Sequence, residues 1–169
     1  MSTGPAPDGE EYLATALIFA STRRGDGEGI FEYGTEARNL LNAMATGGMF
    51  NRQYGMVTFG VNVGHTDPSY VLPAFYEVWA CFDEWNRDFW SGAAGSGRWL
   101  LQHAVNPSTG LAPDQSGFDG SPTGSAGNFT YDARRVVVNV MMDHHFFQVD
   151  PWQITYAETL GAFWTNQGY

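Results

Sequence analysis

The sequence predicts an all-α fold that contains one short β-hairpin. Apolar residues recur at helical spacing in six separate segments. The loops between these segments are rich in Gly, Asp and Pro, which start and stop helices. Hydrophobic residues make up 43% of the chain, which is enough for a packed core and argues against disorder. At 169 residues, the chain has the length of one domain or of part of a larger one.

The first two helices are predicted at about 9–23 and 35–45. The first opens on Asp8 and Glu11, whose spacing is typical of a capping box, and it ends at Gly25. We expect the apolar faces of the two helices to be buried. The first face consists of Tyr12, Leu13, Ala16, Leu17 and Ala20, and the second of Ala37, Leu40, Leu41 and Met44.

The stretch MFNRQYGMVTFG predicts the hairpin, with NRQYG as the turn between Met49-Phe50 and Met56-Val57. A third helix follows at about 67–82, with Asp67 as its N-cap and Pro68 in its first turn. We expect it to continue past Pro73. The fourth helix covers about 86–104.

Residues 106–128 form a long loop without periodicity, and a loop of this length in a compact domain is usually functional or mobile. The fifth helix is predicted at about 131–146. The sixth begins at Asp150-Pro151, where Gln153 completes a second capping-box spacing, and runs toward residue 164.

The first, third and fifth helices each open near an aspartate: Asp8, Asp67 and Asp132. An intervening helix returns the chain between each pair, so all three carboxylates are expected at one end of the molecule. Helical hairpins arranged around a common axis have this layout.

Several motifs resemble glycoside hydrolase family 8, and they occur in the order found in that family. They are PAPDGEEY, DPSY followed by LPAFYEVW, NPSTGLAP and FTYDARR. The resemblance is greatest to the xylan-active members, the endo-xylanases and the reducing-end xylose-releasing exo-oligoxylanases. It implies a partial (α/α)6 barrel of about six of the twelve helices. It also implies inverting hydrolysis of the β-1,4 bonds of xylan or xylo-oligosaccharides, without a cofactor.

The resemblance also implies roles for individual residues. Asp132 in YDARR matches the general base, and Arg135 matches an arginine that contacts this base. Asp8 matches the carboxylate that holds the sugar at the cleavage point, and Asp67 and Tyr70 match positions near the substrate cleft. The general-acid glutamate of the family lies upstream of the APDGEEY motif. Residues 1–169 are therefore expected to be a single partial catalytic domain that lacks the acid and the C-terminal closing helices.

The residues themselves allow plainer readings. Asp132 at a helix start suits an ionised base, because Arg135 shares its face at i+3, but the same pair could be a local salt bridge. Capping alone could explain Asp8 and Asp67.

Exposed aromatic rings could stack on sugar faces. Tyr54 in the hairpin turn and Tyr70 beside Asp67 are the candidates for this role. Trp79 and Trp99, which lie among apolar neighbours, are expected in the core.

Composition excludes several classes of partner. The net charge is −10, and the eight basic residues are scattered arginines, which argues against nucleic acid and anionic membranes. A single cysteine excludes an intramolecular disulfide. The adjacent His144 and His145 point about 100° apart on a helix, so no metal site is predicted.

Two further hypotheses remain open. The chain could be a carbohydrate-binding remnant without turnover. Alternatively, the chain could be a fragment without stable activity, because half a barrel would expose apolar flanks, and self-association is then expected. The sequence leaves endo against exo action, xylan against another β-1,4-glycan, and cellular location undecided.

Overall fold

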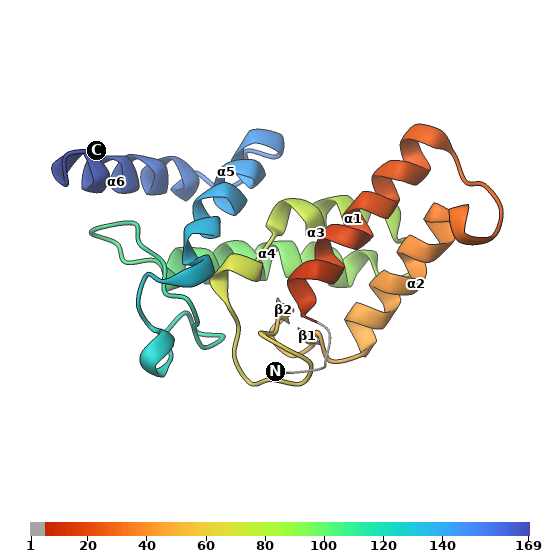
Figure 1. Ribbon diagram of the computed structural model, residues 1–169, viewed down its shortest axis with the longest axis horizontal. Helices are drawn as coiled ribbons and strands as arrows, with labels where there is room; N and C mark the ends of the chain where they lie inside the picture. Colours follow the sequence, from red (N-terminus) through yellow and green to blue (C-terminus); the bar gives the residue numbers. More distant parts are fainter. Residues whose placement is uncertain (1–5) are drawn as a thin grey trace.

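The structure is a computed structural model that describes residues 6–169 (Figure 1). The predicted all-α class with one hairpin is confirmed. The helices are α1 (Pro7–Arg24), α2 (Tyr33–Thr46), α3 (Pro73–Phe82), α4 (Arg87–Ala104), α5 (Val136–Phe146) and α6 (Trp152–Asn166). The antiparallel strands are β1 (Phe50–Asn51) and β2 (Met56–Val57), and the 3-10 helices are η1 (Gly29–Phe31), η2 (Pro68–Tyr70), η3 (Gly124–Ala126) and η4 (Tyr131–Arg135). Within the described residues, no helix combines the length and apolar character needed to cross a membrane.

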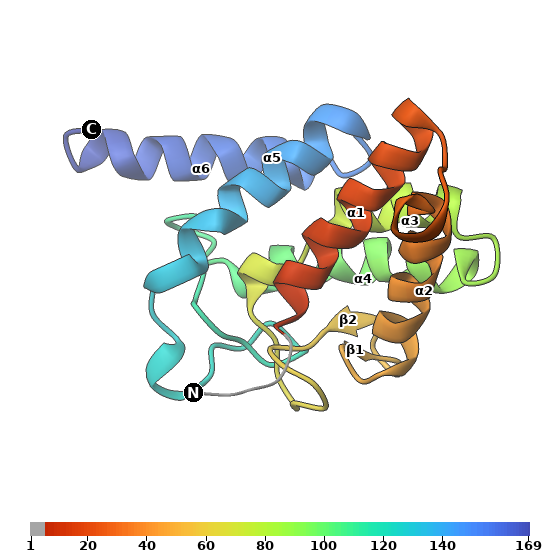
Figure 2. The same cartoon turned by 45° about the vertical axis from the view of Figure 1, so that its right-hand side comes forward.

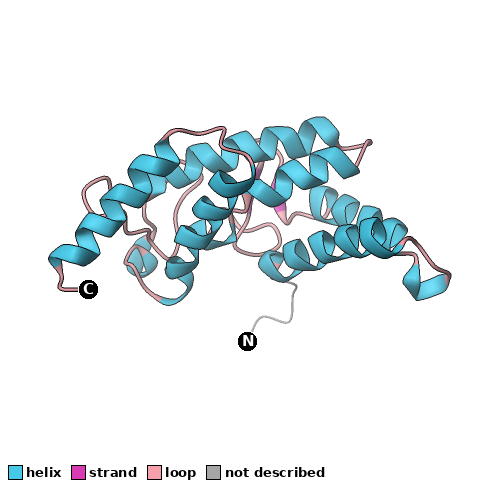
Figure 3. Ribbon diagram, turned by 90° about the horizontal axis from the view of Figure 1, so that it is seen from above, coloured by secondary structure: helices cyan, strands magenta, loops and turns pink. Residues whose placement is uncertain are grey.

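The six helices form three packed pairs, α1–α2, α3–α4 and α5–α6 (Figure 2). Helix α3 contacts both α1 and α5, so the first helices of the three pairs lie in one layer. Figure 3 shows the same helices from above, with the strands beneath them. The hairpin and the long loop lie at one end of the pairs, where α1 and η4 begin (Figure 1).

The centre of the core is aromatic. Trp79 of α3 and Trp90 of α4 are fully buried, with ring centroids 4.9 Å apart. Phe50 of β1 packs edge-on against Trp90 at 5.2 Å, which fixes the hairpin to the helices. The expected burial of Trp79 is confirmed. The expected burial of Trp99 is wrong, because this residue lies on the outer side of α4 and is 44% exposed.

The predicted buried face of α1 is wrong. Tyr12 and Leu13 are about half exposed, whereas Glu11 and Thr15 are buried against α3. Glu11 accepts a hydrogen bond of 2.6 Å from the Tyr76 hydroxyl, and Thr15 accepts one of 2.9 Å from the Trp79 indole. Partners on α3 therefore satisfy the buried polar side chains of α1, which lie beside the core residues Ala14 and Ile18, whereas Tyr12 and Leu13 face outward.

The third and fifth helices begin later than predicted. Pro73 has no backbone N–H and disfavours helical geometry in the residue before it, so the chain is extended at Val71 and re-enters a helix only at Pro73. Tyr131 has φ of 43°, and residues 131–135 form the 3-10 turn η4 before α5. The candidate residues after Asp67 and around Asp132 thus lie on short turns that lead into helices.

A buried ionic cluster joins four helices. Arg98 of α4 makes two 2.7 Å hydrogen bonds to Asp143 of α5 and one of 2.7 Å to Glu77 of α3. Gln153 of α6 donates to the same Asp143 carboxylate at 2.5 Å. The capping box predicted for α6 is therefore wrong: the N-cap is Pro151 without a side-chain cap, Asp150 accepts from the Trp152 amide, and Gln153 points to Asp143.

Candidate active site

Arg135 is the centre of the candidate site. One terminal nitrogen of its guanidinium lies 3.0 Å from Asp8 Oδ2, and the other lies 3.0 Å from Asp132 Oδ2 and 3.1 Å from Ser69 Oγ. These partners come from α1, η4 and η2, which are far apart in the sequence. Burial alone would lower the pKa of Arg135, but the Asp8 and Asp132 carboxylates raise it.

Hydrogen bonds to the backbone hold two of these segments, η2 and the start of α5, together. Asn139 of α5 is buried and donates to the carbonyls of Ser69 at 2.8 Å and Val71 at 3.1 Å. Asp67 caps η2 by accepting from the Ser69 amide at 2.7 Å. Because the chain is extended before Pro73, these two carbonyls have no hydrogen-bond partner within a helix, and the Asn139 amide donates to both. The start of α5 is thereby tied to the DPSY segment.

Capping does not account for Asp8. The N-cap of α1 is Ala6, no side chain caps the helix, and Asp8 instead pairs with Arg135. Glu11, the other half of the expected capping box, points into the core toward Tyr76. The Asp132 side chain is 46% exposed, so one face of this carboxylate is open to solvent beside Arg135.

Two further aspartates, Asp67 and Asp114, lie near Arg135. Burial raises the pKa of Asp67 to about 6, the charge of Asp114 adds to the rise, and the Ser69 hydrogen bonds oppose it. Burial also raises the pKa of Asp114, which lies near Asp132 and Arg135. Sequence reasoning missed Asp114. The only signal was its position directly after the NPSTGLAP motif in a loop already expected to be functional.

The raised pKa of Asp67 predicts a pH-dependent stability. The folded state binds the Asp67 proton more tightly than the unfolded state, so its contribution is most favourable below about pH 4 and is lost as the pH rises through about 6. The shift corresponds to about 2–3 kcal/mol. Asp67→Asn should keep the cap but remove the titration. We therefore expect the free energy of unfolding of Asp67→Asn minus that of the parent chain to increase by about 2–3 kcal/mol between pH 4 and pH 7. Urea titrations at the two pH values measure this difference.

Asp88→Asn, which changes an exposed carboxylate in the first turn of α4, is the matched control and should show no such rise. A difference between Asp67→Asn and the parent chain that stays constant from pH 4 to pH 7 would contradict the prediction.

The two candidate tyrosines occupy different places. Tyr70 is only 8% exposed: its ring stacks on Phe59 at 5.8 Å, and the Arg135 guanidinium carbon lies 5.4 Å from its centroid. This burial leaves little ring surface for stacking on a sugar. Tyr54 lies in the hairpin turn, is 46% exposed and stacks on Phe118 at 5.2 Å. It therefore contributes to a surface other than the Arg135 group.

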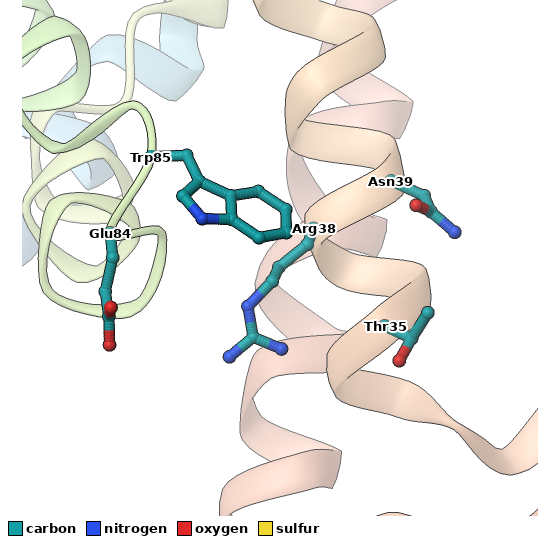
Figure 4. Close-up of a pocket in the computed structure, with 5 residues that line it drawn as sticks. All are labelled: Thr35, Arg38, Asn39, Glu84 and Trp85. Carbon is teal, nitrogen blue, oxygen red and sulfur yellow. The ribbon is translucent and has the colours of Figure 1, made fainter.

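A separate hollow of about 320 Å³ lies between α2 and the turn that joins α3 to α4 (Figure 4). Trp85 and Arg38 approach each other there, whereas Thr35 and Asn39 extend away from the indole. Its polar groups therefore do not converge on one point. Across residues 6–169, no three His, Cys, Asp or Glu side chains are grouped as a metal site would require.

Comparison with known proteins identifies the family. Residues 1–166 match the sequence profile of glycosyl hydrolases family 8. The reducing-end xylose-releasing exo-oligoxylanase Rex8A of Paenibacillus barcinonensis is 39% identical over 179 residues, which cover 98% of this chain and 47% of Rex8A. A reducing end xylose-releasing exo-oligoxylanase of Halalkalibacterium halodurans is 40% identical over 177 residues, with coverages of 98% and 46%. Endoglucanase C of Ruminiclostridium cellulolyticum is 32% identical over 173 residues, with coverages of 99% and 36%.

The backbone agrees as well. The structure of Rex8A complexed with xylose matches this chain with a TM-score of 0.93 and 40% identity, over 96% of this chain and 47% of that chain. The chain thus spans about half the length of the exo-oligoxylanases that it matches. Its helical pairs correspond to part of the (α/α)6 barrel of these enzymes. With the profile matched over nearly its whole length, the chain belongs to glycosyl hydrolase family 8.

Proposed function

We propose that this chain carries the general-base side of an inverting hydrolase that acts on β-1,4-xylan or xylo-oligosaccharides. Asp132 is the general base, Arg135 holds it, and Asp8, Asp67 and Tyr70 contribute to sugar binding. The observation that supports the proposal best is the bridge formed by Arg135. This residue contacts the exposed Asp132 carboxylate and also reaches Asp8, which lies 127 positions before Arg135 in the sequence.

The chemistry follows from this arrangement. An inverting hydrolase needs one carboxylate that deprotonates water beneath the sugar and one carboxylic acid that protonates the leaving oxygen, about 6.5–9.5 Å away. Asp132 faces solvent and can receive the proton of such a water. Asp8, on the other side of Arg135, can accept hydrogen bonds from the hydroxyls of the sugar. Tyr70 can reach the substrate through its hydroxyl edge rather than its face.

Glu11 does not suit the role of the acid. It follows Asp8 by less than one helical turn, but its side chain is fully buried and bound to Tyr76. Burial raises its pKa well above the usual range, although the Tyr76 hydrogen bond opposes the rise, and no route leads from this carboxyl to a leaving group. We therefore propose that the general acid comes from a segment other than residues 6–169, and that these residues are one part of a catalytic domain.

The relatives support xylan as the substrate. Two of them are named reducing-end xylose-releasing exo-oligoxylanases and share about 40% of the aligned residues, against 32% for the endoglucanase. Calorimetric titration of the chain with xylohexaose and with cellohexaose tests the preference. We expect tighter binding of xylohexaose, and equal or reversed affinities would remove xylan as the substrate.

The stereochemical outcome tests the reaction class. Proton NMR of 2,4-dinitrophenyl β-xylobioside incubated with the chain should show the α-anomer first, because water attacks from the face opposite the bond that breaks. The dinitrophenolate leaves without a proton, so this substrate reports on the base side alone. The β-anomer as first product would overturn the proposal.

The alternative function is a carbohydrate-binding chain without turnover, which would bind xylohexaose and release no product.

Self-association is proposed for either function. Large apolar side chains of α1 and α5 are exposed, and a shallow apolar hollow of about 520 Å³ lies along α5. The exposed side chains are Tyr12, Leu13, Phe19, Val138 and Phe146. Sedimentation equilibrium of the purified chain would detect such association, and a strict monomer would exclude it.

A further inference from the structure

A second cleft lies between the hairpin turn, the outer side of α4 and the loop 117–121. Its volume is about 580 Å³, within the range of ligand sites. Tyr54, Trp99 and Phe118 line it together with Asp119 and Ser121. None of the residues bonded to Arg135 lines this cleft.

Each exposed ring in this cleft is backed by another ring. Trp99 stacks on His103 with centroids 4.0 Å apart, and the His103 Nδ1 also lies 2.7 Å from the Trp99 carbonyl oxygen. Tyr54 stacks on Phe118 at 5.2 Å with an interplanar angle of 22°. Tyr54 and Trp99 nevertheless remain 46% and 44% exposed. These are partly open aromatic surfaces, and the apolar C–H faces of pyranose rings pack against such surfaces.

Two glycines allow the surrounding turns to pack closely against α4. Gly55 of the hairpin has φ of 65°, and an added Cβ would lie 3.3 Å from Ser96 Oγ. Gly120 of the loop has φ of 82°, and an added Cβ would lie 2.8 Å from the His103 carbonyl carbon. Both backbones therefore approach α4 more closely than most side chains would permit. The turns that carry Tyr54 and Phe118 therefore pack directly against α4.

The polar lining suits hydroxyl groups. Asp119 Oδ1 accepts from the Ser121 hydroxyl at 2.6 Å and from the Ser121 amide at 3.0 Å. The Ser121 hydrogen bonds lower the pKa of Asp119, so its exposed carboxylate is a charged acceptor at neutral pH. A net charge of −10 opposes polyanionic ligands. A neutral sugar chain offers both apolar faces and hydroxyl donors.

We propose that this cleft is a second carbohydrate-binding site, which holds a neutral β-1,4-linked polysaccharide chain away from the Asp132 carboxylate. The two sites are linked along the chain and through stacked rings. Gly64 lines the cleft, and the next residue, His65, stacks on Phe59 at 5.4 Å. Phe59 in turn stacks on Tyr70, which lies beside Arg135. The choice of xylan as the natural ligand rests on the proposed function.

Native electrophoresis through gels that contain soluble arabinoxylan tests the site with the whole chain. We expect the parent chain to be retarded, and Trp99→Ala and Tyr54→Ala each to weaken the apparent affinity roughly tenfold. Trp99→Tyr, which keeps a ring, should retain most of the retardation. Trp85→Ala is the matched control, because it removes an indole that is 81% exposed in the other hollow and should leave the retardation unchanged.

Asp132→Asn separates this proposal from the proposed function. It should be retarded like the parent chain, whether or not the chain hydrolyses xylan. The second site is overturned if the parent chain is not retarded, or if Trp99→Ala and Tyr54→Ala are retarded as strongly as the parent chain. It is also overturned if the retardation of the variants follows their thermal stability rather than the presence of the rings.

Discussion

Replacing Asp132 by Asn is expected to lower the hydrolysis of 2,4-dinitrophenyl β-xylobioside by 10²–10⁴-fold, the usual cost of losing a general base. The amide has the shape of the carboxylate and can still accept from Arg135 at the position now 3.0 Å away, but it cannot take a proton from water. Initial rates at saturating substrate, followed by dinitrophenolate absorbance, measure the effect. Because this leaving group needs no acid, the comparison isolates the part that we assign to this chain.

Azide supplies a second and sharper readout. It is already anionic and needs no base, and the neutral amide in the Asp132→Asn variant would no longer repel it, so azide should restore turnover of this variant and yield the α-xylobiosyl azide. Asp88→Asn is the matched control for the change of charge, since Asp88 lies in the first turn of α4 and outside the Arg135 group. Equal rates for the parent chain and Asp132→Asn would remove Asp132 from the mechanism. Formation of the β-azide would exclude an inverting reaction.

Local sequence patterns predicted the elements that depend on local rules. The hairpin, α2 and α4 lie within one or two residues of their predicted bounds, because turn residues and helical periodicity define each of them. The approach of Asp8 to the Asp132 segment also follows from helix order, since alternate helices run in the same direction. None of these predictions required knowledge of which side chains meet.

The parts that could not be predicted depend on contacts distant in sequence. Glu11 has the spacing of a capping residue, but Tyr76, 65 positions away, makes its burial tolerable. Asp114 lies in a loop without periodicity, so nothing local places it beside Asp132 and Arg135. Trp99 follows helical spacing, yet the outer side of α4 is covered only partly by the hairpin and the loop.

Replacing Arg98 by Met is expected to reduce the free energy of unfolding by about 3–5 kcal/mol, the largest effect on stability that we predict. Asp143 is fully buried, and Arg98 supplies two of its hydrogen bonds at 2.7 Å. Without the guanidinium, Gln153 alone would face this charge. Urea denaturation at pH 7 measures the loss, with Arg52→Met as the control, because Arg52 donates one backbone hydrogen bond and lies over Phe89 without an acidic partner among the described residues.

A second substitution identifies the cause. Glu77→Gln should cost only about 1 kcal/mol or less, since the Glu77 side chain is 26% exposed and water can replace its contact with Arg98. A deficit in Arg98→Met no larger than that of Glu77→Gln would mean that the stranded Asp143 charge does not determine the stability of this four-helix junction.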